Sequence, residues 1–250
     1  MRLSIAFALT CFILYCGIAQ SGTFGGIDIT TVYDSNFNAS TNTTNAASEI
    51  SGTLSGLFGY YRPMSKNIIS SVNGGIVASR FNAYNQLNGH ILNIGFGSYF
   101  RIDKINSISV SLIGIKKFMV DSSRNGSSAS SSIAFKQKWK PTMWLTEKLS
   151  YGRGFSQLTT GDYTSLRFAS SLKWKTNKRT VLGIGVSISK HDYSFLSGSS
   201  PHKFKAKLMA NYNFNRDWYA QGRLATEYNQ TSYGSNYLNH IFSTGFGYQF

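Results

Sequence analysis

The histidines, acids and cysteines of this chain are the residue types from which catalytic and metal sites are most often built. The sequence contains four His, two Cys and ten Asp plus Glu among 250 residues. His90, His191, His202 and His240 stand far apart, and neither a Cys-x-x-Cys nor a His-x-x-x-His spacing occurs. We therefore expect no metal and no cofactor.

Two histidines are candidates for the general base of a lipid hydrolase or protease. Residues 190–192 read Lys-His-Asp, and Asp162 is an acid on the neighbouring loop that His191 would need as a second positioned group. His240 is followed by Ser243, but this odd spacing puts the two side chains on opposite faces of a strand. We therefore expect no enzymatic activity, and we keep a lipid hydrolase as an alternative.

Basic residues recur at every second position in the C-terminal half. Between 203 and 214, Lys, Met and Asn take the odd positions, while Phe, Ala, Leu and Tyr take the even ones. Period two indicates a strand with two unlike faces. A packed soluble core would not accept consecutive lysines. The pattern predicts strands with a polar face towards a wet interior and an apolar face towards lipid.

With the polar face of each strand turned inward, the interior carries far more basic than acidic side chains. The inward acids are Asp28, Glu49 and Glu227. Confined charge of one sign concentrates counter-ions, and basic rings commonly select anions in pores. The residues expected to line a solute path are Arg101, Lys148, Arg167, Lys173, Lys203, Lys205, Lys207, Arg223 and Glu227. Other inward bases are Lys117, Lys136, Lys138, Lys140 and Lys175, of which those at strand ends have an equally simple use in meeting lipid headgroups or water. Glu227 alternatively pairs with Arg223 across the lumen.

Other residues of these strands leave alternatives open. Small inward residues such as Gly183, Gly185 and Gly247 indicate free space, or room for a neighbouring aromatic side chain to lie flat. Glu147 falls on the outward phase, where a bulge or a pairing with Arg153 would explain it.

The first nineteen residues have the three parts of a secretory signal peptide. Arg2 supplies the positive region, Leu3 to Tyr15 the apolar core, and Ala19 the small residue before cleavage. An apolar run of about 13 residues is too short for a transmembrane helix. Tyr15 argues against a lipoprotein signal at Cys16. We expect residues 1–19 to be removed, and 20–250 to form one domain without cysteine.

Composition and periodicity together predict an all-β chain. It is 42% hydrophobic and only 14% charged, with 24 Gly and 33 Phe and Tyr, which excludes a disordered chain and a coiled coil. Twelve alternating segments of mostly 12 to 14 residues are expected, long enough to cross a bilayer with a tilt. Their expected spans are 24–33, 48–61, 68–81, 90–102, 107–120, 128–140, 143–155, 163–175, 179–192, 203–214, 218–231 and 238–250.

The connections alternate between short and long. Residues 103–106, 141–142 and 176–178 are short turns, while 34–47 and 193–202 are longer and rich in Ser, Asn and Gly. Short turns at one end and loops at the other are typical of outer-membrane barrels. The fold class predicted is a closed antiparallel transmembrane β-barrel of about 12 strands. Ten strands is the alternative if 68–81 or 107–120 folds inside. The aromatics Trp139, Trp144, Trp174, Phe214 and Trp218 near the short turns predict an interfacial girdle, and Pro63 is expected in a turn.

The chain ends in Gly-Phe-Gly-Tyr-Gln-Phe at 245–250. Here it resembles the Gram-negative outer-membrane β-barrel proteins, and in size and basic interior it looks like their small porins. The resemblance implies location in the outer membrane, contact with outer-membrane lipids, and recognition of the last strand, ending in Phe250, by the barrel-assembly machinery. It identifies no specific family.

Three functions fit these features. The first is a porin that lets small anionic solutes diffuse through a basic lumen. The second is a structural or interaction barrel, such as an adhesin or a secretion or assembly partner, that acts through its outer loops. The third is the lipid hydrolase already named. Although the net charge is +15, its bases alternate into a lumen, so we expect no nucleic-acid partner.

Overall fold

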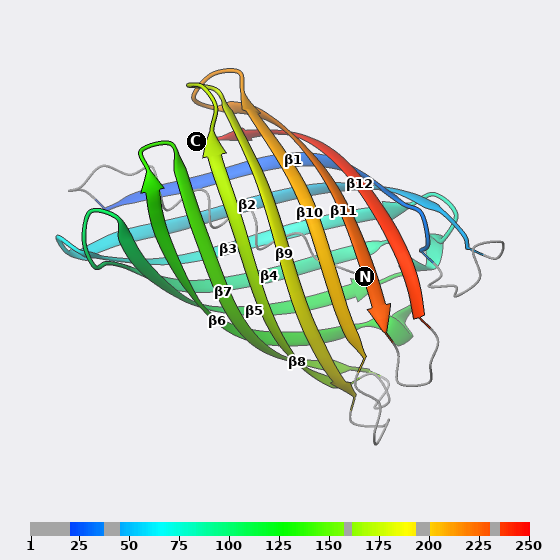
Figure 1. Cartoon of the computed structure of the whole chain (residues 1–250). Coiled ribbons are helices and arrows are strands. Elements are labelled where there is room, and N and C mark those ends of the chain that lie inside the picture. Colours follow the sequence, from blue (N-terminus) through cyan, green and yellow to red (C-terminus); the bar gives the residue numbers. More distant parts are fainter. Residues whose placement is uncertain (1–20, 38–45, 158–161, 194–200, 231–235) are drawn as a thin grey trace.

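The protein forms one closed antiparallel β-barrel (Figure 1). A computed structural model describes residues 21–37, 46–157, 162–193, 201–230 and 236–250. Consecutive strands are hydrogen-bonded neighbours around the ring, and β1 pairs with β12 to close it. The expected signal peptide lies outside the described residues. Within them, no helix is long and apolar enough to cross a membrane.

Twelve strands make up the described barrel, close to the spans expected from the sequence. Segments 68–81 and 107–120 are both wall strands, so the ten-strand alternative is wrong. The bounds are β1 Gly22–Asp34, β2 Glu49–Ser65, β3 Ile68–Phe81, β4 Gly89–Arg101, β5 Asn106–Met119, β6 Gly126–Lys140, β7 Met143–Ser156, β8 Tyr163–Lys175, β9 Thr180–Tyr193, β10 His202–Asn213, β11 Trp218–Gln230 and β12 Asn236–Gln249.

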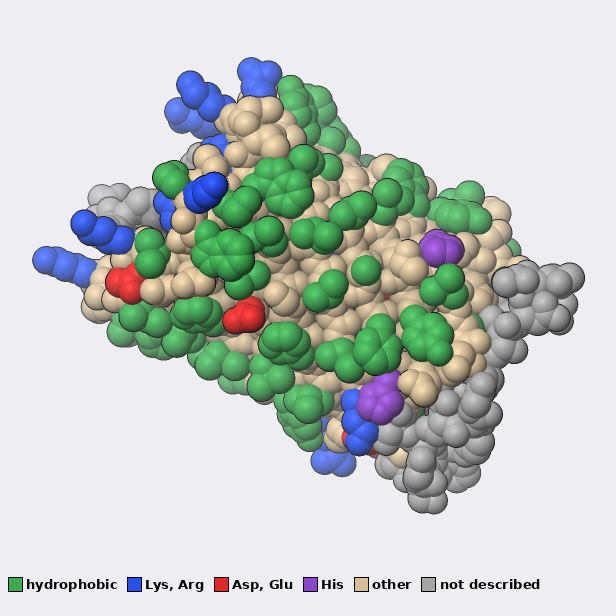
Figure 2. Space-filling view, in the orientation of Figure 1, with side chains coloured by type: hydrophobic (Ala, Val, Ile, Leu, Met, Phe, Trp, Pro, Cys, Tyr) green, Lys and Arg blue, Asp and Glu red, His purple; other side chains and the backbone are tan. Residues whose placement is uncertain are grey.

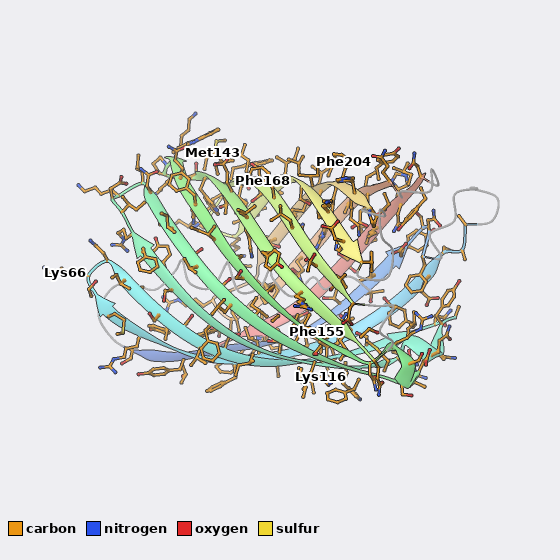
Figure 3. All side chains as sticks on the ribbon, turned by 90° about the horizontal axis from the view of Figure 1, so that it is seen from below. Lys66, Lys116, Met143, Phe155, Phe168 and Phe204 are labelled. Carbon is orange, nitrogen blue, oxygen red and sulfur yellow. The ribbon has the colours of Figure 1, made fainter. Side chains whose placement is uncertain are left out.

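Large hydrophobic side chains cover the outside of the wall. Exposed Ile, Leu, Phe and Val side chains occur at alternate positions along most strands, and Phe204, for example, projects from the outer surface (Figure 3). Figure 2 shows such side chains spread over the outer face of the strands. Lipid offers no hydrogen-bond partners, so a sheet that spans it must close on itself and turn its apolar face outward. The wall meets both conditions.

The short turns lie at the end of the barrel where β1 begins and β12 ends (Figure 1). Three of these turns use the same side-chain cap. Asp103, Asn177 and Asn215 each accept hydrogen bonds from the backbone N–H groups two and three residues later, at 2.7 to 2.9 Å. Such Asx caps explain why the strands reverse in so few residues. Lys and Arg side chains gather at this end (Figure 2).

Two details of this end differ from expectation. Pro63 lies inside β2 and not in a turn, because a register shift between Pro63 and Ser65 accommodates a residue without an N–H. Trp144 faces the lumen and not the lipid. It shares the inward phase of Lys148, and the amine of Lys136 lies 4.9 Å above its ring. Trp139 and Trp218 are exposed on the outside, as a girdle requires.

The seam between β1 and β12 is closed at both ends by specific contacts. At the short-turn end, Gly25 and Phe250 exchange two backbone hydrogen bonds at 3.2 and 3.1 Å. At the loop end, the Oδ1 of Asn239 accepts from the backbone N–H of Asn36 at 3.1 Å and from the hydroxyl of Ser35 at 3.3 Å. Both asparagines are buried. These bonds join the first and last strands far from each other in sequence.

Glu147 is an acid on the lipid-facing side of β7. It pairs across the ladder with Ser170 on β8 and Phe135 on β6, and the register is regular there, so no bulge explains it. Arg153 lies six residues further along the same strand, about 20 Å away, and its guanidinium sits 4.9 Å above the ring of Phe155. The expected pairing of Glu147 with Arg153 is therefore wrong.

Candidate functional site: the lumenal basic wall

Seven cations face the lumen from one side of the barrel. We call them the lumenal basic wall. They are Lys148 on β7, Arg167 and Lys173 on β8, Lys203, Lys205 and Lys207 on β10, and Arg223 on β11. Each lies on the strand face opposite the exposed hydrophobics. Arg101, also expected here, lies at the short-turn end of β4, across the barrel from this wall.

Strand β9 has small inward residues, and it lies between β8 and β10, the two strands that contribute the most cations to the wall. Its inward residues are Gly183, Gly185, Ser187 and Ser189. A Cβ built on Gly185 would lie 2.7 Å from the Cε of Lys207, and one on Gly183 would lie 3.2 Å from the Cγ of Lys173. Side chains from β8 and β10 therefore lie across β9 from opposite sides.

Arg167 is held against the same strand. Its Nη2 donates to the hydroxyl of Ser187 at 3.1 Å. The ladders bring other cations close to it: Lys173 and Lys207 lie directly opposite Gly183 and Gly185 of β9, and Lys148 lies opposite Ala169, two residues from Arg167. The centre of the wall is thus a place where like charges from several strands gather.

The wall is compensated nearer the loop end of β10 and β11. The Nζ of Lys205 lies 2.7 Å from Oε1 of Glu227, and the Nζ of Lys203 lies 3.8 Å from its Oε2. Glu227 is completely buried. The suggested pairing of Glu227 with Arg223 is wrong, because these residues lie four apart on one strand, about 13 Å, whereas Lys205 is directly opposite Glu227 in the ladder.

The opposite wall has a different character. Asp28 on β1 accepts from the hydroxyl of Ser55 and from that of Thr30, the latter at 3.1 Å. Apolar Val77, Ile91 and Met119, joined by Ile115, form a buried cluster on β3–β5. Glu49 is an end cap and not a channel residue, since its carboxylate accepts from the backbone N–H groups of the β3–β4 loop. Inward cations are fewer on this wall, where Arg101 lies at the end of β4 and Lys117 shares the inward phase of Met119 on β5.

Inward glycines are mostly covered by their neighbours. A Cβ on Gly247 would lie 2.5 Å from the ring of Tyr219, one on Gly59 2.4 Å from the ring of Phe24, and one on Gly95 2.8 Å from the amide of Asn73. The interpretation of these positions as free space is wrong. The alternative of a covering aromatic side chain holds at Gly247, whereas Asn73 covers Gly95 and lysine chains approach Gly183 and Gly185.

Aromatic contacts at the loop end were not anticipated from the sequence. The ring of Phe37 lies 5.5 Å from that of Phe81 and 4.8 Å from that of Tyr84, at the mouth of β1–β4. On the other side, the ring of Tyr163 lies 5.7 Å from that of His191 and 5.8 Å from that of Tyr193. The first group belongs to the neutral wall and the second stands at the loop end of the basic wall.

The histidines weighed as catalytic groups are placed as follows. His191 faces inward beside Tyr163, while Lys190 and Asp192 form an ion pair of 3.0 Å on the other face of β9. Asp162 accepts the backbone N–H of Ser156 at 2.7 Å. The Nδ1 of His240 lies 3.1 Å from the hydroxyl of Thr226, an unexpected pair on the lipid face. In the described part of the chain, no cluster of three or more His, Cys, Asp or Glu could hold a metal ion.

Known structures share this architecture. An outer-membrane channel of the COG4313 type from Pseudomonas putida F1 matches with a TM-score of 0.67 at 8% identity, covering 95% of this chain and 98% of that one. This chain has the fold of an outer-membrane β-barrel. The NanC porin matches at 0.56 and 8% identity over 89% and 98% of the two chains, and the KdgM porin at 0.52 and 10% over 90% and 99%.

Sequence comparisons give no such match: no family model fits the chain, and no curated protein resembles it closely enough to be counted. The outer-membrane location agrees with the closed wall and its apolar exterior. At 8 to 10% sequence identity the similarity shows the fold alone. The chemistry of this outer-membrane barrel depends on the residues of its own lumen.

Proposed function

We propose that this barrel is an outer-membrane channel that admits small anionic solutes by diffusion along its lumenal basic wall. The observation that carries the proposal is the gathering of Lys148, Arg167, Lys173, Lys207 and Arg223 on the inward faces of neighbouring strands on one side of the barrel. Fixed cations in a low-dielectric enclosure raise the local concentration of anions and speed their arrival. The solved porins and channels of the same fold support a channel role.

The test is the reversal potential of the refolded protein, without residues 1–19, in a planar bilayer under a tenfold KCl gradient. We expect a chloride-selective current whose reversal potential approaches ~60 mV. Lys207→Glu should shift it towards potassium. The matched control is Lys190→Glu, which changes charge equally but on the outward face of β9. A folded barrel that carries cations, or no current, overturns the proposal.

A second candidate function is an interaction barrel acting through its outer end. It is favoured by the packed contacts of Phe37 with Phe81 and Tyr84, which give that end a fixed surface. Folding can be shown by a heat-dependent gel mobility. Absence of conductance from such a folded sample would favour this candidate.

A further inference from the structure

The centre of the basic wall brings cations together over β9 from both neighbouring strands. Lys207 reaches over Gly185 from β10, while Lys173 reaches over Gly183 and Arg167 over Ser187 from β8. These three anchor points lie within five residues of one strand, about 13 Å from end to end. The small inward residues of β9 allow this, because a Cβ on either glycine would collide with a lysine chain or with Met209.

Two further cations border the same place. Arg223 on β11 lies directly opposite Met209 on β10, and Met209 in turn lies opposite Gly183 on β9. Lys207, two residues from Met209, is therefore the diagonal neighbour of Arg223, about 7–8 Å away between Cα atoms. Lys148 faces Ala169, the inward residue between Arg167 and Ser171, and Arg167 acts electrostatically on it. The five cations therefore come from β7, β8, β10 and β11 and surround the small inward residues of β9.

Among the described residues, the inward acids Glu227 and Asp28 lie outside this group of cations. Glu227 is engaged with Lys203 and Lys205 towards the loop end, and Asp28 is bonded to Ser55 on the opposite wall. Crowded like charges in a low-dielectric shell raise the free energy of the empty site. A monovalent ion relieves the repulsion around one cation, whereas an anion with several charged oxygens relieves it around several at once. The two guanidinium groups add planar donors suited to carboxylate and phosphate oxygens.

We propose that Arg167, Lys148, Lys173, Lys207 and Arg223 form a saturable binding site for polyvalent oxyanions, either polycarboxylates or compounds with two or more phosphate charges. This rests on the proposed function, because the bound anion would be the solute in transit. It goes further in naming the class of solute and in requiring occupancy at one place along the path. Ordinary diffusion through a uniformly basic pore requires neither.

Calorimetric titration of the folded barrel in a non-ionic detergent tests the site without any current. The probes are tripolyphosphate, citrate and acetate at constant ionic strength. We expect saturable one-to-one binding of tripolyphosphate or citrate and none of acetate. Which of the two binds more tightly distinguishes phosphate from carboxylate as the natural group.

Variants locate the site. Lys207→Gln and Arg167→Gln should each weaken binding roughly tenfold, as loss of one charge-assisted bond implies. Gly185→Ala should weaken it too, by displacing the end of Lys207. The controls are Lys190→Gln on the outer face of β9, and Gly222→Ala, where an added Cβ meets nothing within 4 Å. Equal loss in the controls, or none in the lumenal variants, would contradict this location.

The binding and current measurements separate the two proposals. Anion-selective current without saturable binding of either polyvalent probe leaves the channel standing and overturns the site. Binding that depends on Lys207 in a barrel without current supports the site and overturns the channel. If Lys207→Gln does not fold, as judged by heat-dependent mobility, Gly185→Ala and Arg167→Gln decide the matter.

Discussion

Lys205 meets Glu227 directly across the β10–β11 ladder, with 2.7 Å between Nζ and Oε1, and Lys203 approaches the other oxygen at 3.8 Å. One buried carboxylate thus moderates two cations at the loop end of the wall. Below it along β10, Lys207 stands among other cations. The wall thus has a loop-end part that contains Glu227 and a central part in which cations of several strands lie near one another.

Removing the charge of Glu227 should make the channel more anion-selective. Glu227→Gln leaves Lys203 and Lys205 without their carboxylate, so the cation density at the loop end rises. We expect the reversal potential in a KCl gradient to move further towards that of chloride. In the double variant Lys205→Gln/Glu227→Gln the charge balance is restored, and selectivity should return to near the original. A shift towards potassium in the single variant would refute the role assigned to Glu227.

Neutralising Glu147 should stabilise the barrel. A charge on the lipid-facing side is unfavourable, though less so for an acid than for Lys or Arg, and the gain for Glu147→Gln should be on the order of 1 kcal/mol. The measurement is the guanidinium midpoint in phospholipid vesicles, with Ser170→Ala, the cross-strand neighbour, as control. A lower midpoint for Glu147→Gln would mean that this carboxylate makes a favourable contact in the assembled protein.

The seam should depend on Asn239. Replacing it by Leu removes the oxygen that accepts from the backbone N–H of Asn36 and from the hydroxyl of Ser35, while the N–H keeps its second acceptor, Oδ1 of Asp34 at 3.1 Å. Loss of such a hydrogen bond costs roughly 0.5–1.5 kcal/mol. We expect the temperature at which the folded band is lost on gels to fall. Asn236→Leu, at an exposed position on the same strand, should leave it nearly unchanged. Equal behaviour of the two variants would show that the bonds at Asn239 do not hold the seam.

The β4–β5 turn should respond to acid through Asp103. The side-chain bond from Asn106, followed by the backbone bonds from Ile105 and Asn106, holds the pKa of Asp103 below its ordinary value of 3.8. A lowered pKa contributes stability above the unfolded-state value and loses it as the pH falls through the folded-state value. We expect Asp103→Ala to lower the unfolding midpoint at pH 7.

The difference between the native chain and Asp103→Ala should then shrink once the pH falls below 3.8 and towards the lowered pKa. Asp217→Ala, in the turn between β10 and β11, controls for the loss of a turn carboxylate in general. A difference that stays constant from pH 7 to pH 2 would show that the charge of Asp103 is unimportant to the turn.

The last residue offers a test of the assembly partner expected from the sequence. The backbone of Phe250 pairs with Gly25, and its ring covers the place where a Cβ of Gly25 would stand. Phe250→Ala keeps the backbone bonds but removes the ring. We expect slower assembly in cells, with refolding in detergent little affected. A large, equal loss in both settings would assign the ring a purely structural use.

Strand positions and faces were predictable because lipid and water impose opposite demands on alternate residues. The run at 203–214 shows this most directly, since its odd positions all face inward. Side-chain partners were less predictable. The sequence suggests Arg223 as an alternative partner of Glu227 because both are charged and inward, but only the register of β10 against β11 places Lys205 opposite Glu227. Nearness to a turn placed Trp144 in the girdle, although it shares the inward phase of Lys148.

The meeting of lysine side chains over β9 could not be predicted from the sequence either. Gly183 and Gly185 alternate with outward hydrophobics, so their inward phase was evident, but the sequence does not say which neighbours occupy the space they leave. That depends on long side chains from two other strands. The packing of Phe37 against Tyr84 likewise joins two loops whose relative position no local pattern specifies.

The unequal walls have a consequence for how a solute travels. The seven cations on β7–β11 face a wall with fewer cations, which carries the bonded Asp28 and the apolar cluster of Val77, Ile91 and Met119, so the electric field in the lumen has a component perpendicular to the axis. If the barrel passes anions as proposed, we expect an elongated solute with one acidic edge to turn as it enters, with that edge against β8–β10. The solute would then slide along one surface in a fixed orientation, and the shape of its uncharged side would decide whether it fits.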